Sequence, residues 1–309
     1  MKTGFVYDDI YLKHDYPDHP ERKERLISIV NHLESSGLMK EILPVAPRRA
    51  KAEEVALNHD PNYVQEVHDF CKAGGGFLDP DTYANEHSYD VALTAVGGVL
   101  EGIDLILKGS IETAFCAVRP PGHHAEYAKA MGFCLFNNVA VGARYLRKKG
   151  VDKVFIIDFD AHHGNGTQRS FYQDDSVFYF STHEYPFYPG TGSAQEKGAG
   201  KGEGYTLNVP MQAGAGDEDY RPVYEKLLPK VMEDFSPDFV LVSAGYDLHS
   251  DDPLTYLDVS TEGVRMIVKS ILKTCRKLGV PSLFALEGGY NLKALGESVG
   301  VTVEEMLSA

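Results

Sequence analysis

The chain has 309 residues, 43% of them hydrophobic, which is enough for one large core that buries roughly 75% of the unfolded surface. Its formal net charge of -15, from 45 acidic and 30 basic residues, repels phosphate backbones and argues against nucleic acid as the main partner. No segment approaches about 18 consecutive apolar residues, and the N-terminal MKTGFVYDDI has no long apolar run, so we expect neither a membrane span nor a signal peptide.

Short apolar segments that end at glycine, proline or polar residues predict buried β-strands. In chain order these are residues 3–7, 113–118, 153–158, 176–181, 205–209, 238–243 and 282–286, of which the first and the fifth fit the pattern less well. Between the strands, apolar residues recur with helical spacing in two sets: Leu26, Ile29, Val30 and Leu33, then Val91, Ala95, Val99 and Ile103.

Two further helices are predicted from the residues at their ends. One runs from about 219 to 235, with Pro222 in its first turn, where proline is tolerated. The other covers 261–277, with Ser260 as its N-cap and Gly279 as its stop.

Apolar strands that alternate with helices predict a parallel sheet covered on both faces. No Pro/Ser-rich linker or internal repeat divides the chain, so we expect a single α/β domain over residues 1–309. Ligands of such sheets bind beyond the carboxyl ends of the strands. Polar motifs follow four of the predicted strands: RPPGHHA at 119–125, DFDAHHGNG at 158–166, SAGYDLHSDDP at 243–253 and LEGGYN at 286–291. We expect these motifs to meet at one rim of the sheet.

Asp160, His162 and Asp247 are candidate metal ligands. A catalytic metal site of this kind uses three protein ligands and keeps a position open for water. Asp160 and His162 are two residues apart, so in an extended segment their side chains point the same way, and Asp247 would come from a neighbouring strand end. Carboxylates beside buried strands need a charge partner, which weighs against three ordinary loop residues.

His123 and His124 follow Pro-Pro-Gly, which predicts a rigid turn with unusual torsions. Adjacent imidazoles with different partners can hold different protonation states, so one can act as a base while the other stays charged. The alternative is a His-rich surface turn. Tyr290 follows two glycines and could donate a hydrogen bond to a developing oxyanion, although aromatic residues after glycine turns are common.

The four cysteines, Cys71, Cys116, Cys134 and Cys275, form no CxxC pair, and two of them lie in apolar runs. We therefore expect reduced thiols in a cytoplasmic protein, with neither a disulfide framework nor a thiolate zinc site. The sequence does not indicate an oligomeric state.

Together these motifs resemble the histone deacetylase family, including its bacterial and archaeal acetoin-utilisation and acetylpolyamine-amidohydrolase relatives. The resemblance keeps the family's order over nearly the whole chain, through HPER, RPPGHHA, GFCLFNN, DFDAHHGNGTQ, YPGTG, GYDLHSDDP and LEGGYN. It implies an arginase-like α/β fold with a central sheet of eight parallel strands flanked by helices.

The resemblance also implies roles for the candidate residues. Asp160, His162 and Asp247 resemble the family's Zn²⁺ ligands, and Fe²⁺ suits the same ligand set. His124 resembles the general base and acid, and His123 resembles its electrostatic partner.

Three more residues are implied to support this chemistry. Asp158 would hold His123, and Asn165, which stands where some relatives carry Asp, would orient His124. Tyr290 would polarise the acetyl carbonyl. A structural K⁺ or Na⁺ site would use Asp158, Asp160, His162 and Ser181, partly through backbone carbonyls.

The resemblance also implies a narrow substrate channel formed by five residues. Gly132, Phe133 and Tyr188 would surround the methylene chain of an acetylated amine, and Tyr188 departs from the Phe of many relatives. Asp81 resembles a rim acid that grips the substrate backbone, with Asp79 as the competing candidate. Leu254 would lie at the mouth of the channel.

The implied activity is hydrolysis of an acetylated amine, above all N-epsilon-acetyl-lysine in peptides or proteins. The alternatives are an acetylpolyamine deacetylase, a non-catalytic binder of acetylated ligands, and an arginase-like binuclear hydrolase. A polyamine site should carry an acid where Leu254 stands, a binder should have lost a ligand or Tyr290, and a second metal should need another acid in place of Asn165.

Overall fold

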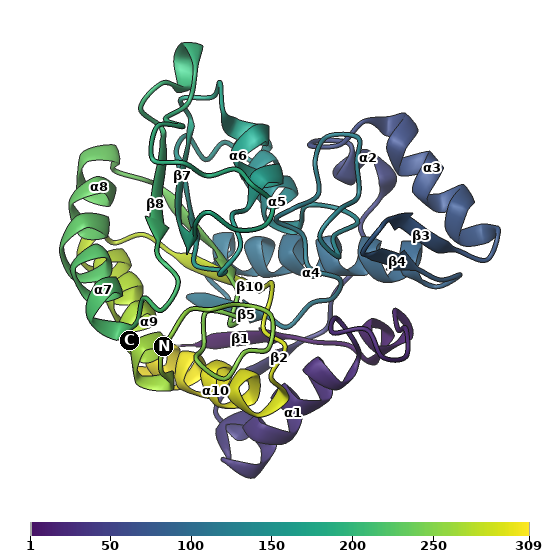
Figure 1. Cartoon of the computed structure of the whole chain (residues 1–309), viewed down its shortest axis with the longest axis horizontal. Helices are drawn as coiled ribbons and strands as arrows, with labels where there is room; N and C mark the ends of the chain where they lie inside the picture. The colour runs from purple at the N-terminus through teal and green to yellow at the C-terminus, as the bar shows by residue number, and fades with distance from the viewer. Residues whose placement is uncertain (1, 309) are drawn as a thin grey trace.

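The computed structural model describes residues 2–308 and contains a central sheet of eight parallel strands (Figure 1). The strand order is β2-β1-β5-β10-β9-β6-β7-β8. The strands are β1 (Thr3–Val6), β2 (Leu43–Val45), β5 (Thr113–Cys116), β6 (Val154–Asp158), β7 (Val177–Glu184), β8 (Thr206–Met211), β9 (Phe239–Ala244) and β10 (Ser282–Leu286). The predicted α/β fold with an eight-stranded parallel sheet is confirmed.

All seven predicted strands are present, with their ends shifted by a few residues. The sequence pattern missed β2 and a separate antiparallel hairpin, β3 (Gly76–Asp79) with β4 (Thr82–Ala84). These strands escaped prediction because each has only three or four residues, and few residues of β2 and β3 are buried. In β2, for example, only Val45 is buried, so no apolar run marks the strand.

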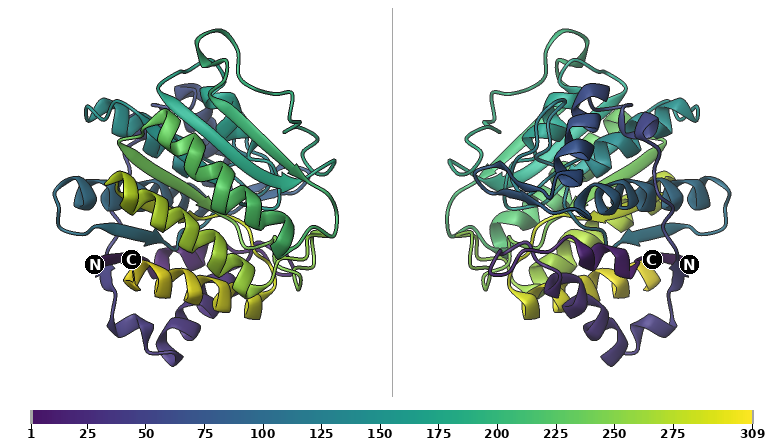
Figure 2. Two further views of the ribbon diagram at one scale, coloured as in Figure 1. Left: turned by 90° about the vertical axis from the view of Figure 1, so that its left-hand side faces the viewer. Right: turned by 90° about the vertical axis from the view of Figure 1, so that its right-hand side faces the viewer.

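Helices cover both faces of the sheet. On one face, α4 (Ser88–Leu107) and α5 (Asn138–Lys148) pack against each other and against central strands. On the other, α1 (Glu24–Ser35), α10 (Leu292–Ser308), α9 (Thr261–Leu278) and α8 (Leu228–Phe235) form a row of neighbours, of which Figure 2 shows the last three side by side. The remaining helical segments are α2 (Ala52–Val55), α3 (Pro61–Lys72), α6 (Asn165–Phe171), α7 (Asp217–Pro222), the 3-10 turns η1 (Asp9–Lys13), η2 (Leu38–Lys40) and η3 (Gly200–Gly202), and the π-helical η4 (Val223–Leu227).

The ends of α9 match the sequence prediction. The Ser260 hydroxyl accepts a hydrogen bond from the Gly263 N–H at 3.0 Å, which satisfies one of the free amides at the helix start. Gly279 ends the helix with φ +69°, a left-handed conformation that glycine adopts without steric cost.

The segment predicted as one helix from about 219 to 235 is interrupted. Its first part, α7, starts at Asp217, so Pro222 is the last residue of α7 and does not lie in the first turn. A π-helical segment follows before α8, which has Pro229 in its first turn. Pro229 has no N–H to donate to the Glu225 carbonyl and its ring crowds the turn before it, which is the π-helical turn, so this second proline accounts for the widened backbone.

The strands that precede the four polar motifs are neighbours at the centre of the sheet, in the order β5-β10-β9-β6. Since these strands are parallel, their carboxyl ends lie at one edge and deliver four loops to the same place. The strand β6 is wholly buried, so the loop that follows it starts from a fixed position. Among residues 2–308, no helix is both long and apolar enough to cross a membrane.

Candidate active site

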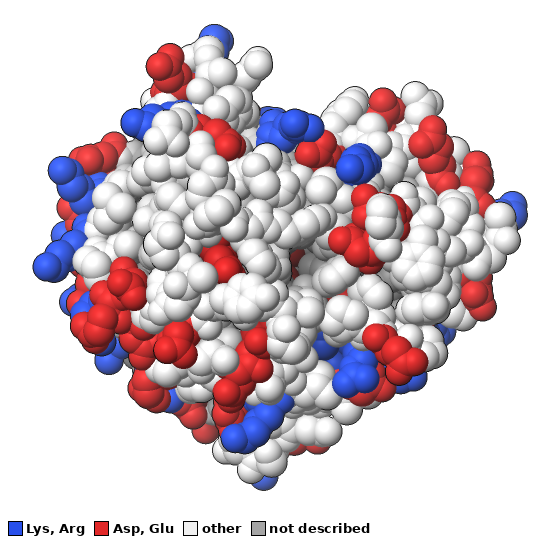
Figure 3. Space-filling view, viewed as in Figure 1, with Lys and Arg blue, Asp and Glu red and all other residues white. Residues whose placement is uncertain are grey.

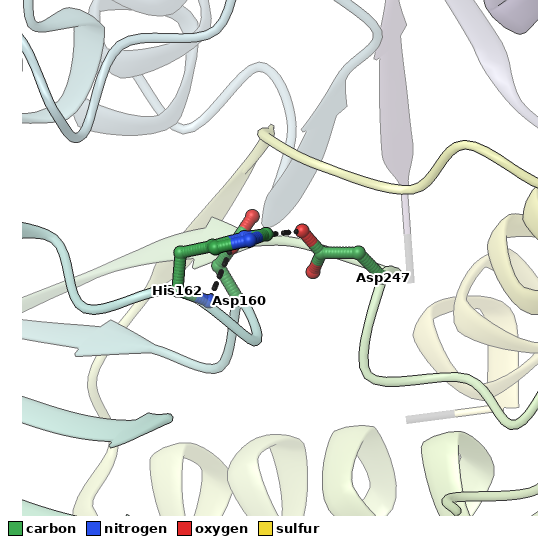
Figure 4. A group of neighbouring side chains, drawn as sticks. All are labelled: Asp160, His162 and Asp247. Atoms are coloured by element: carbon green, nitrogen blue, oxygen red, sulfur yellow. Dashed lines mark hydrogen bonds and ion pairs between the residues drawn. The ribbon is translucent and has the colours of Figure 1, made fainter. Parts of the chain in front are cut away.

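Asp160, His162 and Asp247 meet where the loops after β6 and β9 approach each other (Figure 4). The His162 Nδ1 atom lies 2.9 Å from Oδ2 of Asp247 and 3.2 Å from Oδ1 of Asp160. One ligand atom of each residue lies within 4.8 Å of the other two, a spacing that lets one ion contact all three.

The charge at this triad is suited to a cation. Asp160 and Asp247 are 1% and 0% exposed, and among the described residues their side chains form ion pairs with histidines but with no Lys or Arg. Burial would lower the pKa of His162, but hydrogen bonds to Asp160 and Asp247 raise it to about 10. Buried carboxylates without a permanent positive partner are costly, so a divalent ion that accepts N and O ligands fits this site.

The loop after β10 braces the triad through glycine. The Gly288 N–H donates to Oδ2 of Asp160 at 2.8 Å. A Cβ atom at Gly288 would lie 2.3 Å from Oδ2 of Asp247 and 2.6 Å from Oδ2 of Asp160. A residue with a Cβ atom would collide with both carboxylates, which explains why the first position of the GGY motif is glycine.

His123 and His124 lie side by side, with ring centroids 4.0 Å apart, but they have different partners. The His123 Nδ1 atom is 3.1 Å from Oδ2 of Asp158, and the His124 Nδ1 atom is 2.7 Å from Oδ1 of Asn165. Burial would lower the pKa of His123, but Asp160 and Asp158 raise it well above its usual value. Burial, reinforced by the neighbouring histidines, lowers the pKa of His124 well below its usual value. The pair thus combines a charged imidazole with a neutral one that can accept a proton.

Tyr290 extends from the loop after β10 into the same pocket. Its ring packs edge-on against Phe133, with centroids 5.8 Å apart. Burial raises the pKa of Tyr290 well above its usual value, so the phenol keeps its proton and can act as a hydrogen-bond donor.

A pocket of about 230 Å³ contains this chemistry. It is lined by residues from six loops: Asp81, His124, Gly132, Phe133, His162, Phe187, Tyr188, Leu254 and Tyr290. Figure 3 shows a depression near the centre of this face of the molecule, bordered largely by uncharged residues. The sequence analysis named eight of these nine residues and missed Phe187, whose ring lies 5.6 Å from that of His162.

Asp81 contacts the channel wall itself. Its Oδ1 atom accepts hydrogen bonds from the Gly132 N–H at 3.2 Å and from the Thr82 hydroxyl at 3.0 Å. Gly132 has φ +57°, and a Cβ atom there would lie 2.4 Å from the His124 ring. The turn at Gly132 is therefore held against the ring of His124, with Asp81 as one of its anchors.

A buried ionic network, which the sequence analysis left without a role, supports the site. Glu21 lies in the HPER motif, and its carboxylate pairs with both Arg25 and Arg119. Arg25 also donates to the Gly289 carbonyl at 2.7 Å, and its guanidinium lies 5.0 Å from the centroid of the Tyr290 ring. In the sequence, the one sign of this network is that charged residues stand next to apolar runs. Which residues pair with one another is seen only in the structure.

Two further acids hold the loops that carry His123 and Tyr290. Glu287 accepts hydrogen bonds from the N–H groups of Gly122 and His123 at 2.7 and 3.1 Å. Asp252 accepts from the Tyr290 N–H at 2.7 Å, and burial together with the charge of Asp247 raises the pKa of Asp252 to about 7. The sequence analysis gave neither acid a structural role, since both act through backbone groups that no motif spacing reveals.

Comparison with known proteins places these residues in a family context. Residues 19–306 match the model of the histone deacetylase domain. The chain is 41% identical over 297 residues to a probable deacetylase of Archaeoglobus fulgidus, covering 95% of this chain and 82% of the relative. It is 40% identical over 315 residues to histone deacetylase 15 of Arabidopsis thaliana, covering 99% of this chain and 56% of that protein. A crystal structure of the HDA15 HD domain superimposes with a TM-score of 0.95 and 38% identity, over 99% of this chain and 88% of the other.

Proposed function

Since the chain belongs to the histone deacetylase family, we propose that it is a zinc-dependent hydrolase that releases acetate from N-epsilon-acetyl-lysine in peptides or proteins. One observation supports this most. His162 of the ligand triad, His124 and Tyr290 all line one pocket with aromatic walls, and Asp160 and Asp247 lie beside His162, so water, a base and an oxyanion donor can act on the same amide. We assign the whole of residues 1–309 to one catalytic domain.

Asp160, His162 and Asp247 are the proposed ligands of one Zn²⁺, and Fe²⁺ suits the same set. A bound dication of this kind lowers the pKa of water and polarises a carbonyl oxygen. The proposed K⁺ or Na⁺ site would use Asp158, Asp160, His162 and Ser181, partly through backbone carbonyls, and Asp158 and Ser181 are neighbours across β6 and β7.

The side chains of this chain divide the remaining chemistry. His124 takes a proton from the attacking water at Nε2, because its Nδ1 faces Asn165. It then returns the proton to the leaving amine. The Tyr290 phenol donates to the acetyl oxygen as negative charge develops there. Asp158 holds His123 in place beside the reacting groups through a hydrogen bond to Nδ1.

The substrate is proposed from the shape of the channel. Phe133, Tyr188 and Asp81 all line the pocket. Phe133 and Tyr188 can enclose a methylene chain, and Asp81 is the proposed rim acid that accepts hydrogen bonds from a peptide backbone. Leu254 offers no charge to a second ammonium group, which favours acetyl-lysine over acetylated polyamines.

The experiment compares acetate release from an acetyl-lysine peptide and from N-acetylspermidine, using protein whose metal content has been measured. We expect higher kcat/KM for the peptide. A higher value for acetylspermidine would replace the proposal with a polyamine deacetylase. Binding of the peptide by metal-loaded protein without acetate release would instead identify a non-catalytic binder.

A further inference from the structure

We propose that Glu126 is a positioning residue that fixes the orientation of the Asn165 amide and, through it, the position of the proton on His124. The inference rests on the proposed role of His124 as the base. It adds a residue that contacts neither His124 nor the proposed metal ligands through its side chain.

The surroundings of Asn165 determine which way its amide faces. The Nδ2 atom lies 3.0 Å from Oε1 of Glu126, 3.4 Å from the His124 carbonyl oxygen and 3.4 Å from Sδ of Met131. All three neighbours only accept hydrogen bonds. The NH₂ group must therefore face them, and Oδ1 must face His124.

This orientation sets the tautomer of the neutral imidazole. Oδ1 of Asn165 can only accept, so His124 Nδ1, at 2.7 Å, must carry a hydrogen. The lone pair is then on Nε2, the atom proposed to take the proton from water. A reversed amide would donate to Nδ1 and leave Nε2 protonated, so His124 could not act as a base.

Glu126 is the strongest of the three acceptors and is itself held firmly. A carboxylate makes a charge-assisted hydrogen bond, whereas the other two contacts are long, and one is to a weakly accepting thioether. The Glu126 N–H donates to the Lys129 carbonyl at 2.9 Å, and its own carbonyl accepts from His59 Nδ1 at 2.9 Å. These bonds place the Glu126 side chain, which is 18% exposed, behind Asn165.

The ion pair between Glu126 and Arg169, on the side of Glu126 that faces solvent, provides a control variant. Arg169 donates to Oε2 of Glu126 at 2.6 Å, but its side chain is 69% exposed and has no hydrogen bond to Asn165. Exposed ion pairs of this kind contribute little. Removing Arg169 therefore breaks the ion pair while leaving the hydrogen bond between Glu126 and Asn165.

The first experiment measures kcat and KM of metal-loaded Glu126→Ala, Glu126→Gln and Arg169→Ala with an acetyl-lysine peptide. We expect Glu126→Ala to lower kcat by about 10- to 100-fold with little change in KM, the scale of loss seen for supporting residues in metal sites. Glu126→Gln keeps an acceptor oxygen and should retain at least about a third of the parent kcat, as should Arg169→Ala. Equal losses in Glu126→Ala and Arg169→Ala would overturn the proposal.

The second experiment changes the partner. Asn165→Asp replaces the amide by a carboxylate, which accepts on both sides and needs no orientation. In that background Glu126 becomes a like-charged neighbour, so adding Glu126→Ala should leave kcat unchanged or raise it. The same fold loss in both backgrounds would show that Glu126 acts without Asn165.

A spectroscopic readout separates this inference from the proposed function. The ¹⁵N resonances of His124, identified by their loss in His124→Ala, report which ring nitrogen carries the hydrogen. We expect protonation at Nδ1 in the parent and a mixture of tautomers in Glu126→Ala. An unchanged tautomer would refute the role of Glu126 even in an active enzyme, whereas a changed tautomer in a protein that cleaves no acetylated amine would refute only the proposed function.

Discussion

At the scale of single residues, neighbouring side chains of one type have different chemistry because their partners differ. His123 contacts an aspartate and stays charged, whereas His124 contacts Asn165 and stays neutral. His163 belongs to the second HH pair of the sequence, but its nitrogens bond to a threonine and a glutamine away from the pocket. Neither these contacts nor the lining of the pocket gives His163 a part in the proposed reaction.

The role of Tyr290 can be tested by removing its hydroxyl group. Tyr290→Phe should lower kcat by about 10²-fold, the usual scale for loss of one oxyanion donor. The measurement is acetate release from an acetyl-lysine peptide. Tyr256→Phe is the matched control, since Tyr256 is 69% exposed and outside the pocket. Undiminished turnover in Tyr290→Phe would remove Tyr290 from the mechanism.

The ligand set can be tested without any substrate. Asp160→Ala should abolish retention of the metal, because it removes one of the three proposed ligands. Elemental analysis of purified protein measures the metal content directly. The exposed Asp251, which lies in the same loop as Asp247, provides the control variant Asp251→Ala. Full metal occupancy in Asp160→Ala would contradict the proposed ligands.

At the scale of the elements, local patterns predicted long or buried segments well. The apolar strands and the caps of α9 follow from hydrogen bonding and burial within a few residues. The π-helical break after Pro222 and the short strand β2 were not predicted. The first depends on how two prolines are accommodated in one packed segment, and the second depends on pairing with β1.

The cap of α9 gives a prediction for stability. Ser260→Ala should lower the free energy of unfolding by about 1 kcal/mol, because the Gly263 N–H loses its acceptor. Denaturant titration measures the change. Ser270→Ala makes the same substitution inside the same helix, where alanine is the better helix former, and should be neutral or slightly stabilising. Equal effects of the two substitutions would argue against the cap.

At the scale of the whole molecule, one ionic network connects segments far apart in the chain. Glu21 pairs with Arg25 and Arg119, and Arg25 bonds to the loop that carries Tyr290. All three side chains are almost fully buried. These contacts join the N-terminal segment to the loop that carries Tyr290. Removing one partner of a buried ion pair is strongly destabilising, so we expect the network to stabilise both segments together.

This network predicts a dependence of stability on pH. Burial would raise the pKa of Glu21, but Arg119 and Arg25 lower it to about 2, from 4.5 in the ordinary state. Below about 4.5 the unfolded chain binds the proton first, so the stability that Glu21 contributes is lost as the pH falls from about 4.5 to 2.

Glu21→Gln tests that linkage. At neutral pH the substitution should cost about 3–5 kcal/mol, since it leaves two buried guanidinium groups without their partner. The difference from the parent should shrink as the pH falls through the same range. Glu24→Gln, which changes a 40% exposed carboxylate nearby, is the control. A difference independent of pH would contradict the lowered pKa of Glu21.

The sequence by itself determined the parallel α/β fold, seven of the eight strands of the central sheet and the residue types gathered at their carboxyl ends. These follow from periodicity and burial, which act over a few neighbouring residues. It predicted most residues of the pocket, and the structure brings them together. Only the tertiary structure decided that Phe187 lines the pocket, that Asp252 and Glu287 hold backbone amides, and that Glu126 contacts Asn165. Those contacts join loops distant in the chain, so their geometry is fixed by packing and leaves no pattern in the local sequence.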